Sequence, residues 1–289
     1  MSDFFYVNDR LLAAEESVLP VQDRSYLLGD GLFETILVHS GRPVFLREHL
    51  ERLTSSAHFF GYSWPGKEYL AGIIHLVIKS NSLPEGALRL TVSPAKSEGL
   101  LAAAESTLNI TVTCRRGGPY GDVLYKKGFR AVIARTTRRN EHSPLSRHKT
   151  TNFLDSIVAR REAYAAGADE ALLLNTAGKL AEASASNVFT VHKGEVLTPS
   201  VTDGALPGVV RAKVSELCAL LGIPWREASL SQAALQQAEE AFLTNSLLGL
   251  MPLVSIDGRP VGEGAPGSIT RLLEASYTKQ LTYSDAPPR

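Results

Sequence analysis

Apolar and polar positions alternate with different periods along the first half of the chain, and these periods predict its helices and strands. After an opening strand, turn and strand, residues 46–60 carry an apolar side chain every three or four positions, which indicates an amphipathic helix. Its apolar face consists of Leu46, Leu50, Leu53, Ala57 and Phe60. A second helix is expected over residues 67–80, and β-branched residues at 87–93 and 107–113 predict two further strands.

The second half of the chain mixes strands and helices. It predicts a strand at 129–136, a helix at 153–167 that ends on a glycine, and short strands joined by tight turns. A further helix is predicted from Leu206 to Gly222, with Pro207 in its first turn, where a missing N–H costs nothing. Hairpins mixed with helices predict an α+β fold rather than a doubly wound sheet.

Two domains are expected from the length and from one break in the pattern. Residues 115–123 concentrate glycine and proline without periodicity, so they are the best linker candidate. We therefore expect a small N-terminal domain over 1–114, a larger C-terminal domain over 124–283, and a loose tail over 284–289.

Composition excludes several classes of protein. Thirty Lys and Arg residues balance thirty Asp and Glu residues, which argues against a histone-like protein. Two cysteines, Cys114 and Cys218, are too few for a disulfide framework, and no histidine pair has metal-ligand spacing, so we expect no metal and a cytoplasmic location. The start of the chain lacks a basic signal-peptide region and no apolar run is long enough for a membrane span, so no membrane partner is expected.

The zero net charge hides one basic segment. Residues 116–149 hold nine basic and two acidic residues, a net charge of +7, whereas the flanking parts carry −3 and −4. Such a segment is compatible with three interpretations, namely an ordinary solvated surface, an anion site, or nucleic-acid binding through phosphate contacts. Since the segment shows no nucleic-acid-binding motif, we expect no nucleic-acid partner.

A glycine pair near the start of the chain is a weaker signal. Gly29 and Gly31 resemble the beginning of a dinucleotide fingerprint, but Glu34 occupies the position of the third glycine. Nucleotide binding is therefore not expected there.

Two ionisable residues stand in segments where their chemistry could be used. Lys149 precedes a predicted helix at the end of the basic segment, where neighbouring cations can lower the pKa of an amine and favour a Schiff base. Glu182 lies among small residues between two predicted strands, where a buried carboxylate would need a cationic partner such as a protonated ring nitrogen. A surface lysine and a hairpin-edge glutamate are the plain alternatives.

Two further segments could bind an anion. The predicted first turn of the helix at Gly208, Val209 and Val210 offers free backbone N–H groups to a phosphate, as any helix start does. Thr244, Asn245 and Ser246 end a predicted strand with small hydrogen-bonding side chains, and Ser246 could add a hydroxyl donor to the same phosphate.

Five motifs in this order resemble the fold-type IV pyridoxal-phosphate enzymes, which include branched-chain aminotransferases, D-amino acid aminotransferases and aminodeoxychorismate lyases. The motifs are GDGLFET, REHLERL, KTTNFL with EASASN, ALPGVVR, and TNSLLGLMP. The resemblance implies a small N-terminal α/β sandwich domain, a larger C-terminal pseudo-barrel domain, a pyridoxal 5'-phosphate cofactor and a homodimer.

The same resemblance implies roles for individual residues. Lys149 would carry the Schiff base and move protons, and Glu182 would pair with the pyridine nitrogen. Arg52 and Ser246 would bind the phosphate together with the backbone amides of Val209 and Val210. The remaining residues expected around the cofactor are Leu206, which would pack against its ring, Gly208 and Asn245.

Within the family, the sequence favours 4-amino-4-deoxychorismate lyase, which releases 4-aminobenzoate and pyruvate in folate biosynthesis. The four-residue spacing from Lys149 to Phe153 resembles both the lyases and the D-amino acid aminotransferases and differs from the branched-chain enzymes. The segment TNSLLGLMP resembles the lyases most. A class IV aminotransferase acting on branched-chain or D-amino acids with 2-oxoglutarate is the alternative. The lyase substrate is a dicarboxylate, and the candidate partners for its carboxylates are Lys96, Arg138, Arg139 and Arg147.

Overall fold

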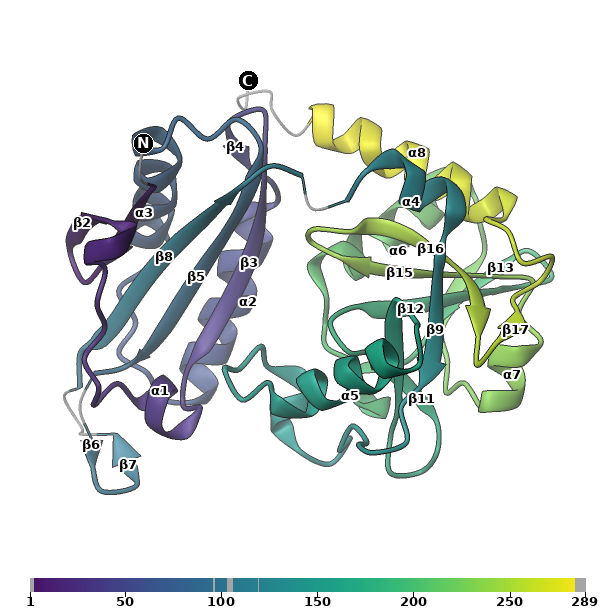
Figure 1. Ribbon diagram of the computed structural model, residues 1–289, viewed down its shortest axis with the longest axis horizontal. Helices are drawn as coiled ribbons and strands as arrows, with labels where there is room; N and C mark the ends of the chain where they lie inside the picture. The colour runs from purple at the N-terminus through teal and green to yellow at the C-terminus, as the bar shows by residue number, and fades with distance from the viewer. Residues whose placement is uncertain (1–2, 96, 103–105, 119, 284–289) are drawn as a thin grey trace. The chain divides into compact units, whose positions relative to one another are not determined.

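A computed structural model of the chain describes residues 3–95, 97–102, 106–118 and 120–283 (Figure 1). The chain divides into two compact units. The first contains the described residues up to 118 together with His148–Phe153, and the second contains Tyr120–Arg147 and Leu154–Tyr283. None of the helices in this described part of the chain is long and apolar enough to cross a membrane.

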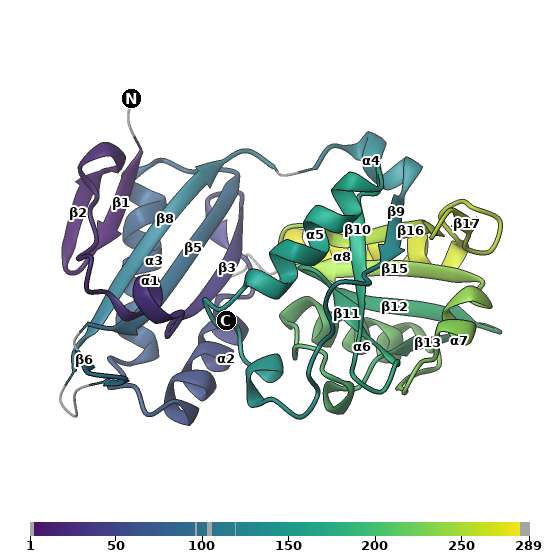
Figure 2. The ribbon, with the colours of Figure 1, turned by 60° about the horizontal axis from the view of Figure 1, so that its bottom comes forward.

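The first unit is built on an antiparallel six-stranded sheet with the order β2-β1-β8-β5-β3-β4. Its strands are β1 (Phe4–Val7), β2 (Arg10–Ala13), β3 (Leu32–His39), β4 (Arg42–Pro43), β5 (Gly86–Pro94) and β8 (Leu108–Arg116). Helices α2 (Leu46–Phe59) and α3 (Lys67–Ser80) lie along one face of the sheet (Figures 1 and 2). The smaller elements are η1 (Ala14–Glu16), α1 (Arg24–Leu28), and the hairpin of β6 (Ser97–Glu98) and β7 (Leu101–Ala102).

Both helices predicted from periodicity in this unit are confirmed. Helix α2 buries Leu50, Leu53 and Ala57 against the sheet, as the apolar repeat requires. The strands predicted at 87–93 and 107–113 are confirmed as β5 and β8, although β8 continues to Arg116, inside the segment expected to be a linker.

Strand β3 places its even-numbered side chains in the core of the first unit. Leu32, Ile36 and Val38 are at most 1% exposed and belong to the cluster of apolar residues beneath the helices. Since side chains alternate between the faces of a strand, Glu34 shares this face, and it is fully buried. Phe33 and Thr35 belong to the opposite face.

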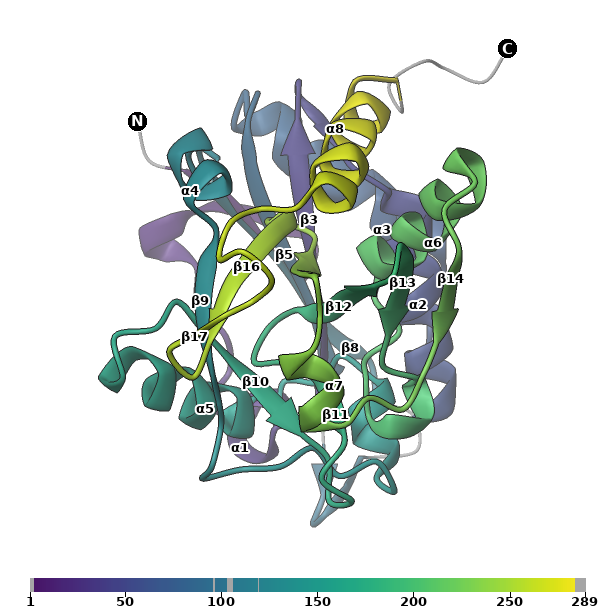
Figure 3. The ribbon, with the colours of Figure 1, turned by 90° about the vertical axis from the view of Figure 1, so that its right-hand side faces the viewer.

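The second unit contains a nine-stranded mixed sheet in which β16 (Gly249–Ile256) is shared by two parts. The first half of β16 pairs with β15, and its second half pairs with β9 and β17. The other strands are β9 (Phe129–Ile133), β10 (Glu170–Leu174), β11 (Leu180–Ala183), β12 (Asn187–His192), β13 (Glu195–Thr198), β14 (Trp225–Glu227), β15 (Glu240–Asn245) and β17 (Arg259–Pro260). Figure 3 shows how strongly this sheet curls.

An irregularity between Leu253 and Ser255 marks the change of partner along β16. Gly128 lies directly against it, with φ of 73°, and a Cβ at this position would stand 2.4 Å from Val254 Cγ1. The start of β9 can therefore approach the bulge only with glycine at this position.

Helices cover this sheet. They are α4 (Asp122–Lys127), α5 (Leu154–Ala165), α6 (Val209–Leu221), α7 (Gln232–Gln236) and α8 (Ser268–Tyr283), with the short turns η2 (Pro144–Arg147) and η3 (Val201–Asp203). Helix α5 packs on β10 through alanines, including Ala159 and Ala163, which allow a close approach. Strand β9 ends at Ile133, earlier than the predicted 136, and the proposed helix at 153–167 is α5.

The division of the chain differs from the sequence prediction at one segment. The change of unit near residue 119 falls inside the expected linker, but His148–Phe153, assigned by sequence to the C-terminal domain, belongs to the first unit. The reason is pairing with β3, because Phe33 N donates to Lys149 O at 2.9 Å and Leu32 forms a bridge with Thr150. The expected tail at 284–289 lies outside the described residues.

Candidate active site

Lys149 lies in a loop that hydrogen bonds hold on the first unit. Besides the bond from Phe33 N to Lys149 O, Thr151 N donates to Gly31 O at 2.8 Å and Thr151 Oγ1 donates to Gly29 O at 2.8 Å. Backbone bonds thus fix the lysine at its own carbonyl and two residues after it. Its Nζ atom lies 4.5 Å from the ring centre of Phe33.

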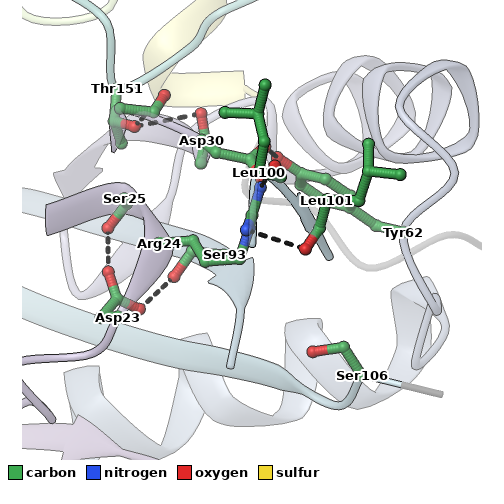
Figure 4. A network of polar contacts seen from close by, with 12 residues as sticks. Asp23, Arg24, Ser25, Asp30, Tyr62, Ser93, Leu100, Leu101, Ser106 and Thr151 are labelled. Carbon is green, nitrogen blue, oxygen red and sulfur yellow. Dashed lines mark hydrogen bonds and ion pairs between the residues drawn. The ribbon is translucent and has the colours of Figure 1, made fainter. Parts of the chain in front are cut away.

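The turn that receives Thr151 is itself held by a polar network (Figure 4). Arg24 donates from Nε to Asp30 Oδ2 at 2.7 Å and from its terminal nitrogens to two carbonyls of the β6–β7 hairpin. Tyr62 OH donates to Asp30 Oδ1 at 2.6 Å. Gly31 completes the turn, since a Cβ there would stand 2.6 Å from Ser25 Cβ. The glycines of GDGLFET therefore allow the loop that carries Lys149 to pack closely on this turn.

His148, next to the lysine, contacts α2. Its Nδ1 lies 2.9 Å from Ser56 Oγ, and its ring stacks on Phe59 with ring centres 4.5 Å apart. This contact adds a side-chain anchor to the loop that carries Lys149.

Two cations and two aromatic rings gather at the outer face of β3. The guanidinium carbon of Arg89 lies 3.7 Å from the ring centre of Phe33, the ring that also receives Lys149. Phe153 meets Phe33 edge to face at 5.7 Å. Arg89 was missed by the sequence analysis, although its register opposite Thr35 on β5 assigns it to this face.

Arg52, expected at the phosphate, forms an ion pair inside the first unit. It donates from Nε to Glu34 Oε1 at 2.8 Å and from NH2 to Glu34 Oε2 at 2.6 Å, a two-bond fork. His49 Nδ1 lies 2.7 Å from the same Oε2. Burial raises the pKa of Glu34, but the charges of Arg52 and His49 lower it more strongly, to about 2.

In the second unit, Glu182 is a buried carboxylate whose partners include Arg139 and the backbone of Leu206. It lies within β11 and not between strands as predicted, and it is 7% exposed. Arg139 NH2 lies 2.7 Å from Oε1, and the backbone N–H of Leu206 donates to Oε2 at 2.9 Å. Arg139, considered above as a substrate partner, therefore pairs with the carboxylate expected to face the pyridine nitrogen.

The segment EASASN joins the other motifs of this unit. Asn187 Nδ2 donates to Leu206 O at 2.9 Å, so both backbone groups of Leu206 are fixed by residues of this segment. Asn245 Nδ2 donates to Ala185 O and Ser186 Oγ. Its Oδ1 accepts from the N–H groups of Leu247 and Leu248.

These bonds engage the whole side-chain amide of Asn245. An amide side chain offers two donors and two acceptor positions, and protein groups occupy all four. Asn245 therefore shapes the turn that contains Ser246.

Helix α6 begins with an open N-terminus. Gly208 is its N-cap, and among the described residues no side chain caps the first turn, which also contains no acidic residue. Pro207 precedes the cap and lies outside the helix, contrary to the prediction. The N–H groups of Val209 and Val210 are thus arranged for an anion.

The basic segment does not form one uniform surface. Arg116, Arg130 and Arg139 each pair with a carboxylate, which offsets part of the excess charge. Arg138 donates to backbone carbonyls and Arg147 is exposed at the end of η2. Lys96, another proposed substrate partner, lies outside the described residues.

Comparisons with known proteins identify the family. A profile of the class IV amino-transferases matches residues 31–256, so the chain belongs to this family, whose members use pyridoxal phosphate. The chain is 31% identical over 287 residues to branched-chain-amino-acid aminotransferase-like protein 2 of Arabidopsis thaliana, covering 98% of this chain and 51% of the plant protein. The chain therefore spans about half the length of that relative.

Solved structures of the family share the fold. A branched-chain amino acid aminotransferase of T.th. with pyridoxamine 5'-phosphate matches with a TM-score of 0.92 and 27% identity, covering 99% of this chain and 96% of the other. A Legionella pneumophila protein provisionally named 4-amino-4-deoxychorismate lyase matches with a TM-score of 0.83 and 30% identity, covering 92% and 96%. The expected α+β fold of this family is confirmed.

The residues of the chain fit the cofactor of this family. The open start of α6 provides N–H donors for a phosphate, and Gly208 leaves no room for a side chain, because a Cβ would stand 2.0 Å from Asn187 Oδ1. Glu182 is a buried carboxylate held in place by Arg139. Pyridoxal phosphate supplies an electron sink when bound, and these groups would hold its charged ends.

Proposed function

We propose that the protein is a pyridoxal-phosphate-dependent 4-amino-4-deoxychorismate lyase that forms 4-aminobenzoate and pyruvate. Lys149 would hold the cofactor covalently and move protons at Nζ. Glu182 would stabilise the charged pyridine nitrogen, and Arg52, Ser246 and the amides of Val209 and Val210 would bind the phosphate.

The observation that carries this proposal is the group of side chains around Phe33. A guanidinium that stacks on a ring keeps its N–H groups in the plane and can still bind a carboxylate. Arg89 stacked on Phe33 therefore supports binding of an anionic substrate beside Lys149. Neither Phe33 nor Phe153, which meet edge to face beside Lys149, has a hydroxyl that could carry a proton.

Proton transfer would accordingly fall to Lys149. Its backbone is fixed by Phe33 N and its neighbour Thr151, so the motion left to it is that of its own side chain. Rotation about the bonds of its side chain would let the amine reach more than one carbon of a bound substrate, which elimination with aromatisation requires.

The proposal is tested with the purified protein and 4-amino-4-deoxychorismate. We expect 4-aminobenzoate and pyruvate in equal amounts without added keto acid, and a loss of about 100-fold in kcat/KM for Arg89→Met, since it removes a charge-assisted carboxylate contact. Lys149→Ala should abolish the yellow chromophore that borohydride reduces. Failure to form 4-aminobenzoate would refute the lyase assignment.

A class IV aminotransferase is the second candidate. It is supported by the name of the Arabidopsis relative, a branched-chain-amino-acid aminotransferase-like protein. Turnover of leucine or D-alanine that depends on 2-oxoglutarate, without any lyase product, would establish this function instead.

We also infer that the protein works as a homodimer. The first unit exposes several large apolar side chains close in sequence, including Val21 at 75% and Tyr26 at 73%, and its hairpin exposes Leu100 at 78%. Arg24 ties that hairpin to α1 (Figure 4). Exposed apolar patches of this kind mark interaction surfaces. Light scattering of the purified protein should give twice the 31.2 kDa chain mass, and a monomer would contradict the inference.

A further inference from the structure

We infer that Glu34 is a positioning residue that fixes the guanidinium of Arg52 for the phosphate of the cofactor. This inference rests on the phosphate-binding role proposed for Arg52. It adds a residue that lies within GDGLFET but was considered only as a mismatch to a nucleotide-binding motif.

The position of Glu34 in the sheet is unusual for a charged residue. The alternation along β3 places it with Leu32 and Ile36 on the face covered by helices, and none of its surface is exposed. A carboxylate at such a position is retained only if partners compensate the loss of water. Here the partners are Arg52 and His49, which stand one helical turn apart on α2.

The pair of hydrogen bonds between Arg52 and Glu34 fixes the orientation of the guanidinium as well as its distance from the carboxylate. Glu34 occupies one edge of the planar guanidinium, formed by Nε and NH2, at 2.8 and 2.6 Å. Two parallel bonds prevent rotation of the guanidinium about its long axis, so its other edge points in one direction. His49 holds Glu34 Oε2 and thereby prevents the carboxylate from turning with the arginine.

Glu34 is ionised throughout the pH range around neutrality. Because its pKa lies at about 2, the fork consists of two full charges at neutral pH. Fixing a long side chain when it meets an anion costs conformational entropy, and Arg52 is 12% exposed. Glu34 therefore restricts the side chain of Arg52 before the phosphate arrives.

The test compares two ligands that differ only in the phosphate. Full-length protein stripped of cofactor is titrated with pyridoxal phosphate and with unphosphorylated pyridoxal, for wild type, Glu34→Gln, Arg52→Gln and the double variant. We expect Glu34→Gln to weaken pyridoxal phosphate binding at least tenfold while pyridoxal binding changes less than threefold. In the Arg52→Gln background the same substitution should have less than a threefold effect on either ligand.

Other results would overturn the inference. Equal weakening of both ligands by Glu34→Gln would indicate a merely structural ion pair, as would a full effect in the absence of Arg52. If Arg52→Gln leaves the preference for the phosphorylated ligand unchanged, the proposed role of Arg52 fails, and the role of Glu34 fails with it. Circular dichroism checks each variant for folding, and Glu34→Asp, which keeps the charge but shortens the fork, replaces Glu34→Gln if that variant does not fold.

Discussion

Replacing Gly208 with alanine should damage the start of α6 and, with it, the proposed phosphate site. The backbone at Gly208 has φ of −72°, which any residue can adopt, so the effect must come from space alone. A Cβ there would lie 2.0 Å from Asn187 Oδ1. Since ordinary contacts are about 3.5 Å, the amide of Asn187 would have to move by more than about 1 Å.

That movement has a calculable cost. Asn187 Nδ2 donates to Leu206 O at 2.9 Å, so the amide cannot move without breaking this bond and shifting the loop before α6. Overpacking and one lost buried hydrogen bond together cost about 1–3 kcal/mol. If the same displacement moves the N–H groups of Val209 and Val210, binding of pyridoxal phosphate should weaken about tenfold or more, since tenfold corresponds to about 1.4 kcal/mol.

The other end of the same helix offers a matched control. Gly222 has φ of 68°, and a Cβ there meets no heavy atom within 4 Å. Gly222→Ala should therefore cost about 1–2 kcal/mol through backbone strain while leaving the start of α6 in place. Urea unfolding measures the stability of both variants, and titration of cofactor-free protein measures the affinity for pyridoxal phosphate. If Gly208→Ala keeps wild-type affinity, or if Gly222→Ala loses as much, the phosphate does not bind at the start of α6.

Three further predictions concern the two units separately. Gly128→Ala should destabilise the protein by about 2–4 kcal/mol in urea unfolding, because the new Cβ would collide with Val254 at a backbone φ of 73°; an unchanged midpoint would contradict the role of the bulge. Because the pKa of Glu34 falls from 4.5 to about 2 on folding, its stabilising effect is complete above pH 4.5 and is lost as the pH falls towards 2. Wild type should therefore lose more stability between pH 5 and pH 3 than Glu34→Gln does, and parallel losses would refute this. Arg139→Met should cost about 1–3 kcal/mol by removing the guanidinium that pairs with the buried carboxylate of Glu182, and this cost should shrink when Glu182→Gln is also present.

Much of the local structure could be predicted from the sequence. The apolar repeat at 46–60 is a property of neighbouring turns of one helix, so periodicity alone located α2, and the same holds for α3. The motifs around Lys149 and Glu182 also indicated the cofactor, and the family assignment is confirmed. The roles proposed for individual site residues remain predictions.

Contacts between segments far apart in the sequence were harder to predict from the sequence. One partner of Glu182 is Arg139, which lies 43 positions earlier in the sequence, and no periodicity links the two. Arg89 was missed because its contact with Phe33 exists only when β5 pairs with β3. The sequence analysis assigned His148–Phe153 to the C-terminal domain, whereas the segment belongs to the first unit, since it pairs with β3 across more than a hundred residues.

The sequence by itself determined the helices, most strands, the α+β class and the family, because each of these follows from short-range periodicity or from motifs read along the chain. Only the tertiary structure decided which charges meet. Glu34 shows the difference, because alternation in β3 could have revealed that it faces the core, yet only packing of α2 on that strand shows Arg52 and His49 as its partners. Ion pairs and hydrogen bonds act over a few ångströms in space, and the fold alone brings residues that are far apart in sequence within that range.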